Sequence, residues 1–164
     1  MTWRGVDFAD FYADAHPRLV AAVTGFCGDP EIGRDAADEA MVRAFERWER
    51  VGRMESPAGW VMATGMNQAR RILRRRSRLD ALLRRSRPPA AVEGPAAEVW
   101  QIVGDLPERQ RQAIVLRHLA DLTEPDIAAA MGVTRGTVSS TLRAAHAALR
   151  SRLTENLEPQ ESGS

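Results

Sequence analysis

A short run near the end of the chain has the pattern of two helices joined by a tight turn. Thr123 and Asp126 have the spacing of a capping box, in which a hydroxyl and a carboxylate satisfy free amides at a helix start. Gly132 stands where the first helix can end in a left-handed residue. Thr134 can cap the helix that follows, and Val138 is placed to face inward. The run therefore predicts a helix-turn-helix, a unit that presents one helix to the major groove of DNA.

Helical spacing of apolar residues also dominates the rest of the chain, and no strand-like alternation persists anywhere. Pro17 interrupts the first stretch, where it either kinks the helix or starts a second one. The fourth stretch is expected to pass through Pro107 as one helix. The expected helices cover about residues 8–26, 32–50, 57–83 and 96–119, followed by the helix-turn-helix to about 153.

Two of these helices are expected to bury a clear apolar face. In the second helix the inward residues are Ala37, Met41, Ala44, Phe45 and Trp48. Its other face offers two charge pairs spaced four apart, Glu39–Arg43 and Glu46–Arg50. The third helix starts at an N-cap, Ser56, followed by Pro57. Its apolar stripe runs through Val61, Ala69, Ile72, Leu73, Leu79 and Leu83.

These patterns predict an all-α fold of two small helical domains joined by a short linker rich in proline and alanine. The second is expected to be a winged-helix-like helix-turn-helix domain. The expected boundaries are 1–87 for the first domain, 88–98 for the linker, 99–153 for the second domain and 154–164 for a flexible tail.

Positive charge is concentrated in one short block, although the whole chain has a net charge of only +1. Residues 70–87 contain 9 Arg and one acid, a net of +8. Residues 1–69 have 7 Arg and 11 acids, a net of −4, and residues 88–164 have 7 Arg and 10 acids, a net of −3. Such an unbalanced block predicts contact with nucleic acid, with Arg74, Arg75 and Arg76 exposed.

Several classes of function have little support in the sequence. No apolar run approaches the length of a membrane span, and the first residues lack the pattern of a signal peptide, so we expect a cytoplasmic protein without membrane contact. Cys27 is the only cysteine and is expected to be a small buried hydrophobe, and the three histidines have no metal-binding spacing. We therefore expect no metal or other cofactor. An enzyme is not expected, because no catalytic triad, phosphate loop or carboxylate pair stands out.

Three blocks stand in order along the chain: residues 35–45, then Trp60, Asn67 and residues 69–76, then residues 106–111 continued by the helix-turn-helix. Together they resemble the extracytoplasmic-function (ECF) sigma factors of bacterial RNA polymerase. Residues 35–45 resemble the helix that docks on the polymerase clamp. Trp60, Asn67 and residues 69–76 resemble the helix that reads the minus-ten promoter element. Residues 106–111, continued by the helix-turn-helix, resemble sigma region four, which reads the minus-thirty-five element.

The resemblance implies a sigma factor that binds core RNA polymerase at its clamp and flap regions and directs recognition and melting of promoter DNA. No nucleotide-hydrolysis motif is present, so the opening energy would come from binding. Many relatives are held by an anti-sigma factor, which becomes a candidate partner. Polymerase binding is assigned to Asp35, Asp38, Glu39, Val42 and Arg43. Minus-ten recognition and strand holding are assigned to Gly52, Arg53, Met54, Glu55, Asn67, Arg70, Arg71, Arg74, Arg75, Arg76 and Arg78. The helix-turn-helix contacts are assigned to Arg109, Arg111, Thr134, Arg135, Thr137, Ser139, Ser140 and Arg143.

The sequence departs from the family pattern at two places. Asp38 and Met41 stand where the family usually has Gln and Phe. On the recognition helix, four uncharged or nearly uncharged residues stand where the family usually has Lys or Arg: Ser139, Thr141, Ala144 and His146. Contact with the minus-thirty-five element is therefore expected to be weak or to rely on other cations, namely Arg109, Arg111 and Arg117. Two alternatives stay open: a degenerate sigma-like interaction protein, and a stand-alone helix-turn-helix transcription regulator.

Overall fold

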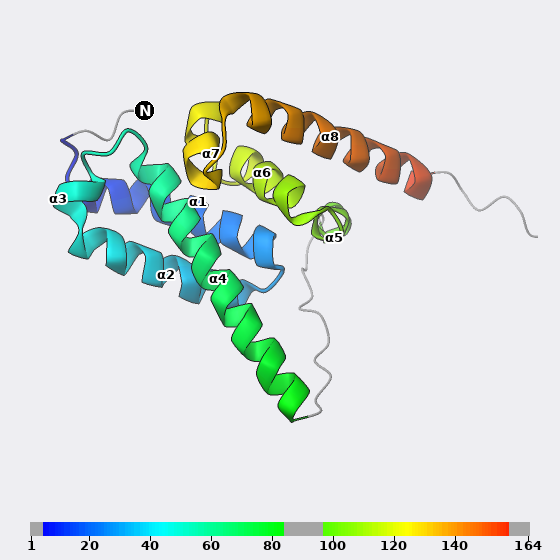
Figure 1. The fold of residues 1–164 in the computed structure, drawn as a ribbon, viewed down its shortest axis with the longest axis horizontal. Helices are drawn as coiled ribbons and strands as arrows, with labels where there is room; N and C mark the ends of the chain where they lie inside the picture. Colours follow the sequence, from blue (N-terminus) through cyan, green and yellow to red (C-terminus); the bar gives the residue numbers. More distant parts are fainter. Residues whose placement is uncertain (1–4, 84–96, 158–164) are drawn as a thin grey trace, which may run out of the picture.

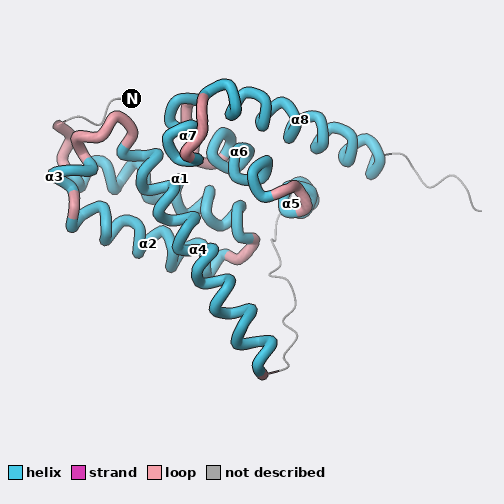
Figure 2. Tube along the Cα trace, in the orientation of Figure 1, coloured by secondary structure: helices cyan, strands magenta, loops and turns pink. Residues whose placement is uncertain are grey.

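The computed structural model describes residues 5–83 and 97–157, and every regular element in these ranges is a helix (Figures 1 and 2). The helices are α1 (Phe8–Cys27), α2 (Pro30–Glu46), α3 (Trp48–Val51), α4 (Pro57–Leu82), α5 (Ala97–Gly104), α6 (Glu108–His118), α7 (Glu124–Met131) and α8 (Arg135–Leu157). The all-α prediction is confirmed. The expected linker lies outside the described residues except for its last two positions, which begin α5, and the first four residues of the expected tail extend α8.

Helices α1 to α4 form a first module around one apolar core. Phe11, Leu19, Met62 and Met66 are fully buried within it. Burying each such side chain contributes about 1.5–3 kcal/mol relative to leaving it in water. Of the two outcomes expected at Pro17, a second helix does not start there, because α1 continues through this residue to Cys27.

The second expected helix is divided in two. Helix α2 ends at Glu46, Arg47 leaves helical geometry with φ −119°, and α3 begins at Trp48. Because Glu46 and Arg50 now lie in different helices, they lack the spacing of one helical turn that their expected ion pair requires. The other expected pair is present, since Arg43 Nε donates to Glu39 Oε1 at 2.9 Å. Phe45 is 65% exposed and is not an inward residue. Phe45 follows the buried Met41 at a spacing of four, but it lies in the last turn of α2, at the outer edge of the buried stripe and about 100° from Ala44.

Helix α4 is buried at its start and extends beyond the body of the first module at its end (Figure 1). Ser56 caps it, because its Oγ accepts from the Gly59 amide at 3.0 Å. Val61 and Ala69 are buried as expected, but Leu79 is 51% exposed and Leu83 49% exposed. Ile72 and Leu73 are half-buried and pack against the core, so the expected apolar stripe fails only at its end. There α4 extends beyond the body of the first module (Figure 1).

Helices α5 to α8 form a second module that contains the helix-turn-helix. The helix expected to pass through Pro107 is broken there into α5 and α6. Proline lacks an N–H and disfavours helical geometry in the residue before it, so Pro107 instead occupies the position just before α6. Helices α7 and α8 form the predicted helix-turn-helix, with Gly132 in the left-handed region at φ 65° and Val138 fully buried.

The two modules pack against each other, which the sequence did not predict. Helix α7 lies on α4, and α6 lies on α1 (Figure 1). Two glycines allow this close approach. A Cβ on Gly59 would lie 3.0 Å from the carbonyl oxygen of Asp126, and a Cβ on Gly25 would lie 2.6 Å from Leu119 Cδ1. In addition, Arg18 Nη1 donates to the carbonyl of Ala120 at 3.3 Å.

Candidate nucleic-acid interface

Exposed arginines cover the part of α4 that extends beyond the first module. They are Arg71, Arg74, Arg75 and Arg78, which we call the arginine stripe. Arg71, Arg74 and Arg78 follow the exposed Asn67 at spacings of four, three and four, so these three arginines and Asn67 share one helix face. The only acid of the block, Asp80, is half-buried and has a partner. Arg84, Arg85 and Arg87 lie outside the described residues. The stripe is a cationic surface suited to a nucleic-acid backbone.

Two arginines of the predicted strand-holding set already have carboxylate partners. Arg76 Nη1 lies 2.8 Å from Asp29 Oδ2, and this arginine is half-buried, so the expectation that it is exposed is wrong. Asp29 stands at the start of α2, and the pair ties α4 to that helix. Arg70 Nε donates to Glu108 Oε1 at 2.8 Å, which ties α4 to the second module. The sequence could not reveal either pair, because the partners are 47 and 38 residues apart.

The loop before α4 is well ordered by backbone hydrogen bonds. The Arg53 amide donates to the carbonyl of Arg50 and the Met54 amide to that of Val51, at 3.2 and 3.1 Å. Gly52 packs so closely on Trp48 that a Cβ would lie 3.0 Å from its ring. Of the four predicted loop residues, Arg53 and Glu55 are exposed, Met54 is half-buried and Gly52 is buried. Since α4 rises 1.5 Å per residue, this loop and the arginine stripe lie about 20 Å apart along one helix. A single strand of DNA that contacted both this loop and the arginine stripe would run along α4 past Asn67.

The predicted polymerase-docking residues lie together on one side of α2. Asp35, Asp38 and Val42 are exposed, and Glu39 pairs with Arg43. Asp38 Oδ1 also accepts from His16 Nε2 of α1 at 2.7 Å. This acidic face contains an apolar centre formed by Val42, which the sequence assigned to docking, and Phe45, which it placed inward. Val42 is 53% exposed, and the Phe45 ring contacts Phe8 with centroids 5.1 Å apart. Its spacing of four from the buried Met41 gave no signal that Phe45 is exposed.

The helix-turn-helix has the hydrogen bonds that its sequence predicts. The Asp126 amide donates to Thr123 Oγ1 at 3.4 Å, while the Thr123 hydroxyl donates to the Asp126 carboxylate at 2.9 Å. At the start of α8, the Thr137 amide donates to Thr134 Oγ1 at 3.2 Å. The first turns of α8 expose most of the predicted contact residues: Thr134, Arg135, Thr137, Ser140 and Arg143. Ser139 is half-buried and donates to Glu124 Oε2 at 3.0 Å, so it is occupied within the motif.

The three arginines expected to compensate for the weak recognition helix all bind backbone carbonyls. Arg109 donates to Met131, Arg111 to Gly104 and Arg117 to Leu122, at 3.3, 2.8 and 3.2 Å. These contacts join α6 to α5, to α7 and to the loop before α7. The geometry therefore gives these side chains a structural role in the second module and leaves fewer of their N–H groups for phosphate.

His118 is placed so that it adds little positive charge to this module. His118 Nε2 and His146 Nε2 lie 3.0 Å apart, with their rings edge to face. Burial lowers the pKa of His118 below its ordinary value of 6.5, and the neighbouring His146 and Arg117 lower it further. At neutral pH the His118 imidazole is therefore mostly uncharged and acts as a hydrogen-bonding neighbour of α8 rather than as a phosphate-binding cation.

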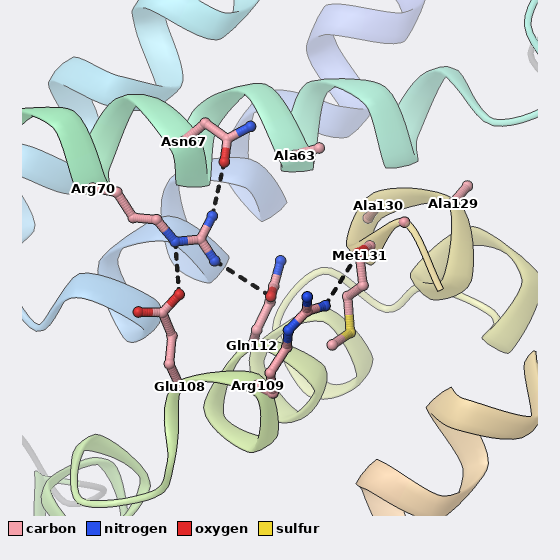
Figure 3. A pocket seen from close by; sticks show the side chains of 10 residues that line it. Ala63, Asn67, Arg70, Glu108, Arg109, Gln112, Ala129, Ala130 and Met131 are labelled. Carbon is pink, nitrogen blue, oxygen red and sulfur yellow. Dashed lines mark hydrogen bonds and ion pairs between the residues drawn. The ribbon is translucent and has the colours of Figure 1, made fainter. Parts of the chain in front are cut away.

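A polar cleft of about 420 Å³ lies where the two modules meet (Figure 3). Arg70 lines one end of it, away from Ala129 and Met131 (Figure 3). It donates to Glu108, to Asn67 Oδ1 at 2.8 Å and to Gln112 Oε1 at 3.4 Å, and its central carbon lies 4.8 Å from the centroid of the Phe26 ring. Asn67 comes from α4, whereas Glu108 and Gln112 come from α6 (Figure 3). The cleft is thus lined by two predicted strand-holding residues, of which Arg70 binds side chains of the second module.

Within the described residues, no helix is long and apolar enough to cross a membrane, and no three His, Cys, Asp or Glu side chains are grouped as they are around a metal ion.

Comparison with known proteins identifies both modules. A family model described as "Sigma-70 region 2" matches residues 11–79, and one described as "Sigma-70, region 4" matches residues 96–149. The chain is 26% identical over 154 residues to a protein named RNA polymerase sigma-E factor from Streptomyces avermitilis, covering 90% of this chain and 86% of that protein. It is 27% identical to the protein of the same name from Streptomyces antibioticus, covering 90% and 85%. Among solved structures, the sigma factor RpoE of Bartonella quintana, in complex with the anti-sigma factor NepR, has a similar fold, with a TM-score of 0.79. The two chains are 19% identical, and the match covers 90% of this chain and 97% of that one.

Proposed function

The chain belongs to the sigma-70 family of RNA polymerase sigma factors, and we propose that it binds core RNA polymerase, recognises a two-part promoter and helps to open it. The observation that carries this proposal is the arginine stripe on α4, which lies on the module that matches sigma region 2. The proposed domains are residues 1–87 for the region-two-like unit and 99–153 for the region-four-like unit, with a linker at 88–98 and a tail at 154–164. The site of action is the cytoplasm, together with the polymerase.

In the proposed mechanism, the first module docks on the polymerase clamp through the acidic face of α2 and its apolar centre. Exposed acids steer the approach of a basic partner, while a desolvated aromatic contact supplies most of the affinity. Phe45 therefore joins the docking set of Asp35, Asp38, Glu39, Val42 and Arg43. The second module binds the flap region of the polymerase and places α8 in contact with the minus-thirty-five element.

Strand separation is proposed to occur along α4. The arginine stripe binds the phosphates of one strand, and the ordered loop at residues 52–55 takes an extruded base. Extrusion costs a few kcal/mol of unstacking, which contacts in the loop must return. Because the protein has no nucleotide-hydrolysis motif, binding to the single strand is the only source of that energy in the proposal.

An anti-sigma factor is a further proposed partner. The structural relative from Bartonella quintana was solved with the anti-sigma factor NepR, and it shares the arrangement of both modules with this chain. A protein of that kind would hold the present chain away from polymerase by covering the same docking surfaces.

Run-off transcription with purified core polymerase tests the proposal. The first template is the region upstream of the chain's own gene, because such factors often drive their own expression. We expect a transcript of defined length that requires both the chain and core polymerase. The absence of a chain-dependent transcript from every cognate upstream region would show that the proposed function is wrong.

A degenerate, sigma-like interaction protein is the second candidate function. The specific observation in its favour is the low number of free cations on the second module, since Arg109, Arg111 and Arg117 bind backbone carbonyls and Ser139 binds Glu124. Binding to core polymerase without any transcript would favour this candidate. A stand-alone regulator would instead bind duplex DNA tightly in the absence of polymerase.

A further inference from the structure

Two histidines of the second module form a pair that the proposed function does not use. His118 is the last residue of α6, and His146 lies midway along α8. Their Nε2 atoms are 3.0 Å apart, their rings are edge to face at 76°, and both residues are exposed. They are 28 residues apart in the chain, so their spacing in the sequence gives no sign of the pair. The fold thus brings two imidazole nitrogens together on the surface.

The separation of the two nitrogens fits two adjacent ligands of one metal ion. Imidazole nitrogens lie about 2.0–2.1 Å from a bound transition metal. Two such nitrogens at a right angle about the metal are about 2.9 Å apart, close to the observed 3.0 Å. A right angle is typical of the square-planar and tetragonal sites of Ni²⁺ and Cu²⁺, whereas the tetrahedral angle of Zn²⁺ needs about 3.3–3.4 Å. Exposed side chains change rotamer freely, so both nitrogen lone pairs can turn toward a shared point.

Packing between α6 and α8 holds the two histidines in place (Figure 1). Val115 and Leu116 of α6 are fully buried, and so is Ala145 of α8, which directly precedes His146. The backbone of each histidine therefore belongs to a helix that is fixed by the core of the second module. Ligands that are already positioned lose little conformational freedom when a metal ion binds.

We propose that His118 and His146 bind one divalent transition-metal ion through their Nε2 atoms, with water completing its coordination, and that this ion clamps α8 to α6. Imidazole suits such ions, whereas Mg²⁺ and Ca²⁺ prefer oxygen ligands. No third His, Cys, Asp or Glu joins the pair within the described residues, so the site is open and its affinity moderate. Arg117, adjacent to His118 in the chain, adds a like charge that lowers this affinity further.

Titration of the untagged full chain with NiCl₂ tests the proposal. Isothermal titration calorimetry should show one Ni²⁺ bound per chain. Because the unfolded chain has no preformed pair, Ni²⁺ at about 100-fold above its measured Kd should raise the melting temperature by about 5 °C or more. EDTA should reverse this rise, and MgCl₂ at the same concentration should leave the melting temperature unchanged.

Three single variants show whether the pair is the site. His118→Gln and His146→Gln each leave one imidazole, and each should weaken Ni²⁺ binding at least about tenfold. The matched control is His16→Gln, which removes the third histidine of the chain and should bind Ni²⁺ as wild type does. Glutamine can still form a hydrogen bond with the remaining histidine, so loss of Ni²⁺ binding at unchanged helix content reports metal ligation and not a structural hydrogen bond. No Ni²⁺ binding by wild type would overturn the proposal, and so would undiminished binding by His118→Gln or His146→Gln.

The proposed metal site does not depend on the proposed function, because the free chain is measured without DNA or polymerase. A transcript from the wild-type holoenzyme, together with no Ni²⁺ binding by the free chain, would refute the metal site alone. Ni²⁺ binding that requires both histidines, together with no transcript from any cognate upstream region, would refute the proposed function and leave the metal site in place.

Discussion

Replacing Asp29 should weaken the first module more than its position in a short loop suggests. Its Oδ1 accepts from the amides of Glu31 and Ile32 at 3.0 and 3.1 Å, which caps α2. Its Oδ2 lies 2.8 Å from Arg76 Nη1, which ties α4 to the start of α2. One carboxylate thus satisfies a helix terminus and positions an arginine of the basic block.

The magnitude follows from these two contributions. Loss of an N-cap carboxylate to alanine costs about 1 kcal/mol. The ion pair with Arg76 adds about 0.5–1 kcal/mol, because its side chains are only 26% and 20% exposed yet remain partly screened by water. We expect Asp29→Ala to lower the free energy of unfolding by about 1.5–2 kcal/mol in total. Asp29→Asn should cost only about 0.5–1 kcal/mol, because asparagine caps a helix as well as aspartate does and loses only the charge.

Urea denaturation followed by circular dichroism measures the free energy of unfolding of both variants, and thermal denaturation measures their melting temperatures. The melting temperature should fall by about 4–7 °C for Asp29→Ala and by about half of that or less for Asp29→Asn, given the size of the chain. Arg76→Ala in the Asp29→Asn background should add little, because the pair is already broken. Equal destabilisation by Ala and Asn would refute the capping argument, and a full additional loss in the double variant would refute the ion pair.

Two further predictions concern titratable groups. Because the pKa of His118 is lowered in the folded state, the unfolded chain binds protons more readily, so the free energy of unfolding should be highest above about pH 6.5 and should decrease as the pH falls below that value. His118→Gln should flatten this pH dependence in urea denaturation between pH 7.5 and 5.5. An unchanged dependence of the free energy of unfolding on pH would contradict the assignment to His118. Burial raises the pKa of the Cys27 thiol above its ordinary value of 9.0, and the Cys27 Sγ donates to the carbonyl of Asp29 at 3.4 Å. Iodoacetamide should therefore label Cys27 at least about tenfold more slowly in the native chain than in urea at the same pH. Equal labelling rates would show that the thiol is accessible.

Local signals in the sequence were sufficient for the helix-turn-helix. Thr123, Gly132 and Thr134 act through hydrogen bonds and backbone angles within a few residues of their own positions, so their types and spacing determine the outcome. The same holds for Ser56 at the start of α4. Pro107 also carries a local signal, because proline breaks the helix there although helical apolar spacing continues on both sides of it.

The remaining features depend on contacts between distant segments. Whether Leu79 and Leu82 are covered depends on what packs beside the end of α4, and their own spacing cannot reveal this. Arg70 and Arg76 look equivalent to Arg74 in the sequence, yet both have carboxylate partners from other elements. The packing of the two modules depends on small residues such as Gly25. From the sequence alone, a glycine inside a helix indicates only low helix propensity and does not show which segment packs against it.

Permanganate reactivity of promoter thymines tests the central claim, that this chain opens DNA by holding one strand along α4. The holoenzyme is assembled with wild type, with Arg74→Ala/Arg78→Ala from the arginine stripe, or with Arg150→Ala/Arg152→Ala, which removes the same charge from the end of α8. We expect reactive thymines in the minus-ten region with wild type and with the α8 variant, and at least about tenfold lower reactivity with the stripe variant, since each lost phosphate contact weakens strand binding. Full reactivity with the stripe variant, at equal occupancy of polymerase, would show that the arginine stripe does not hold the strand.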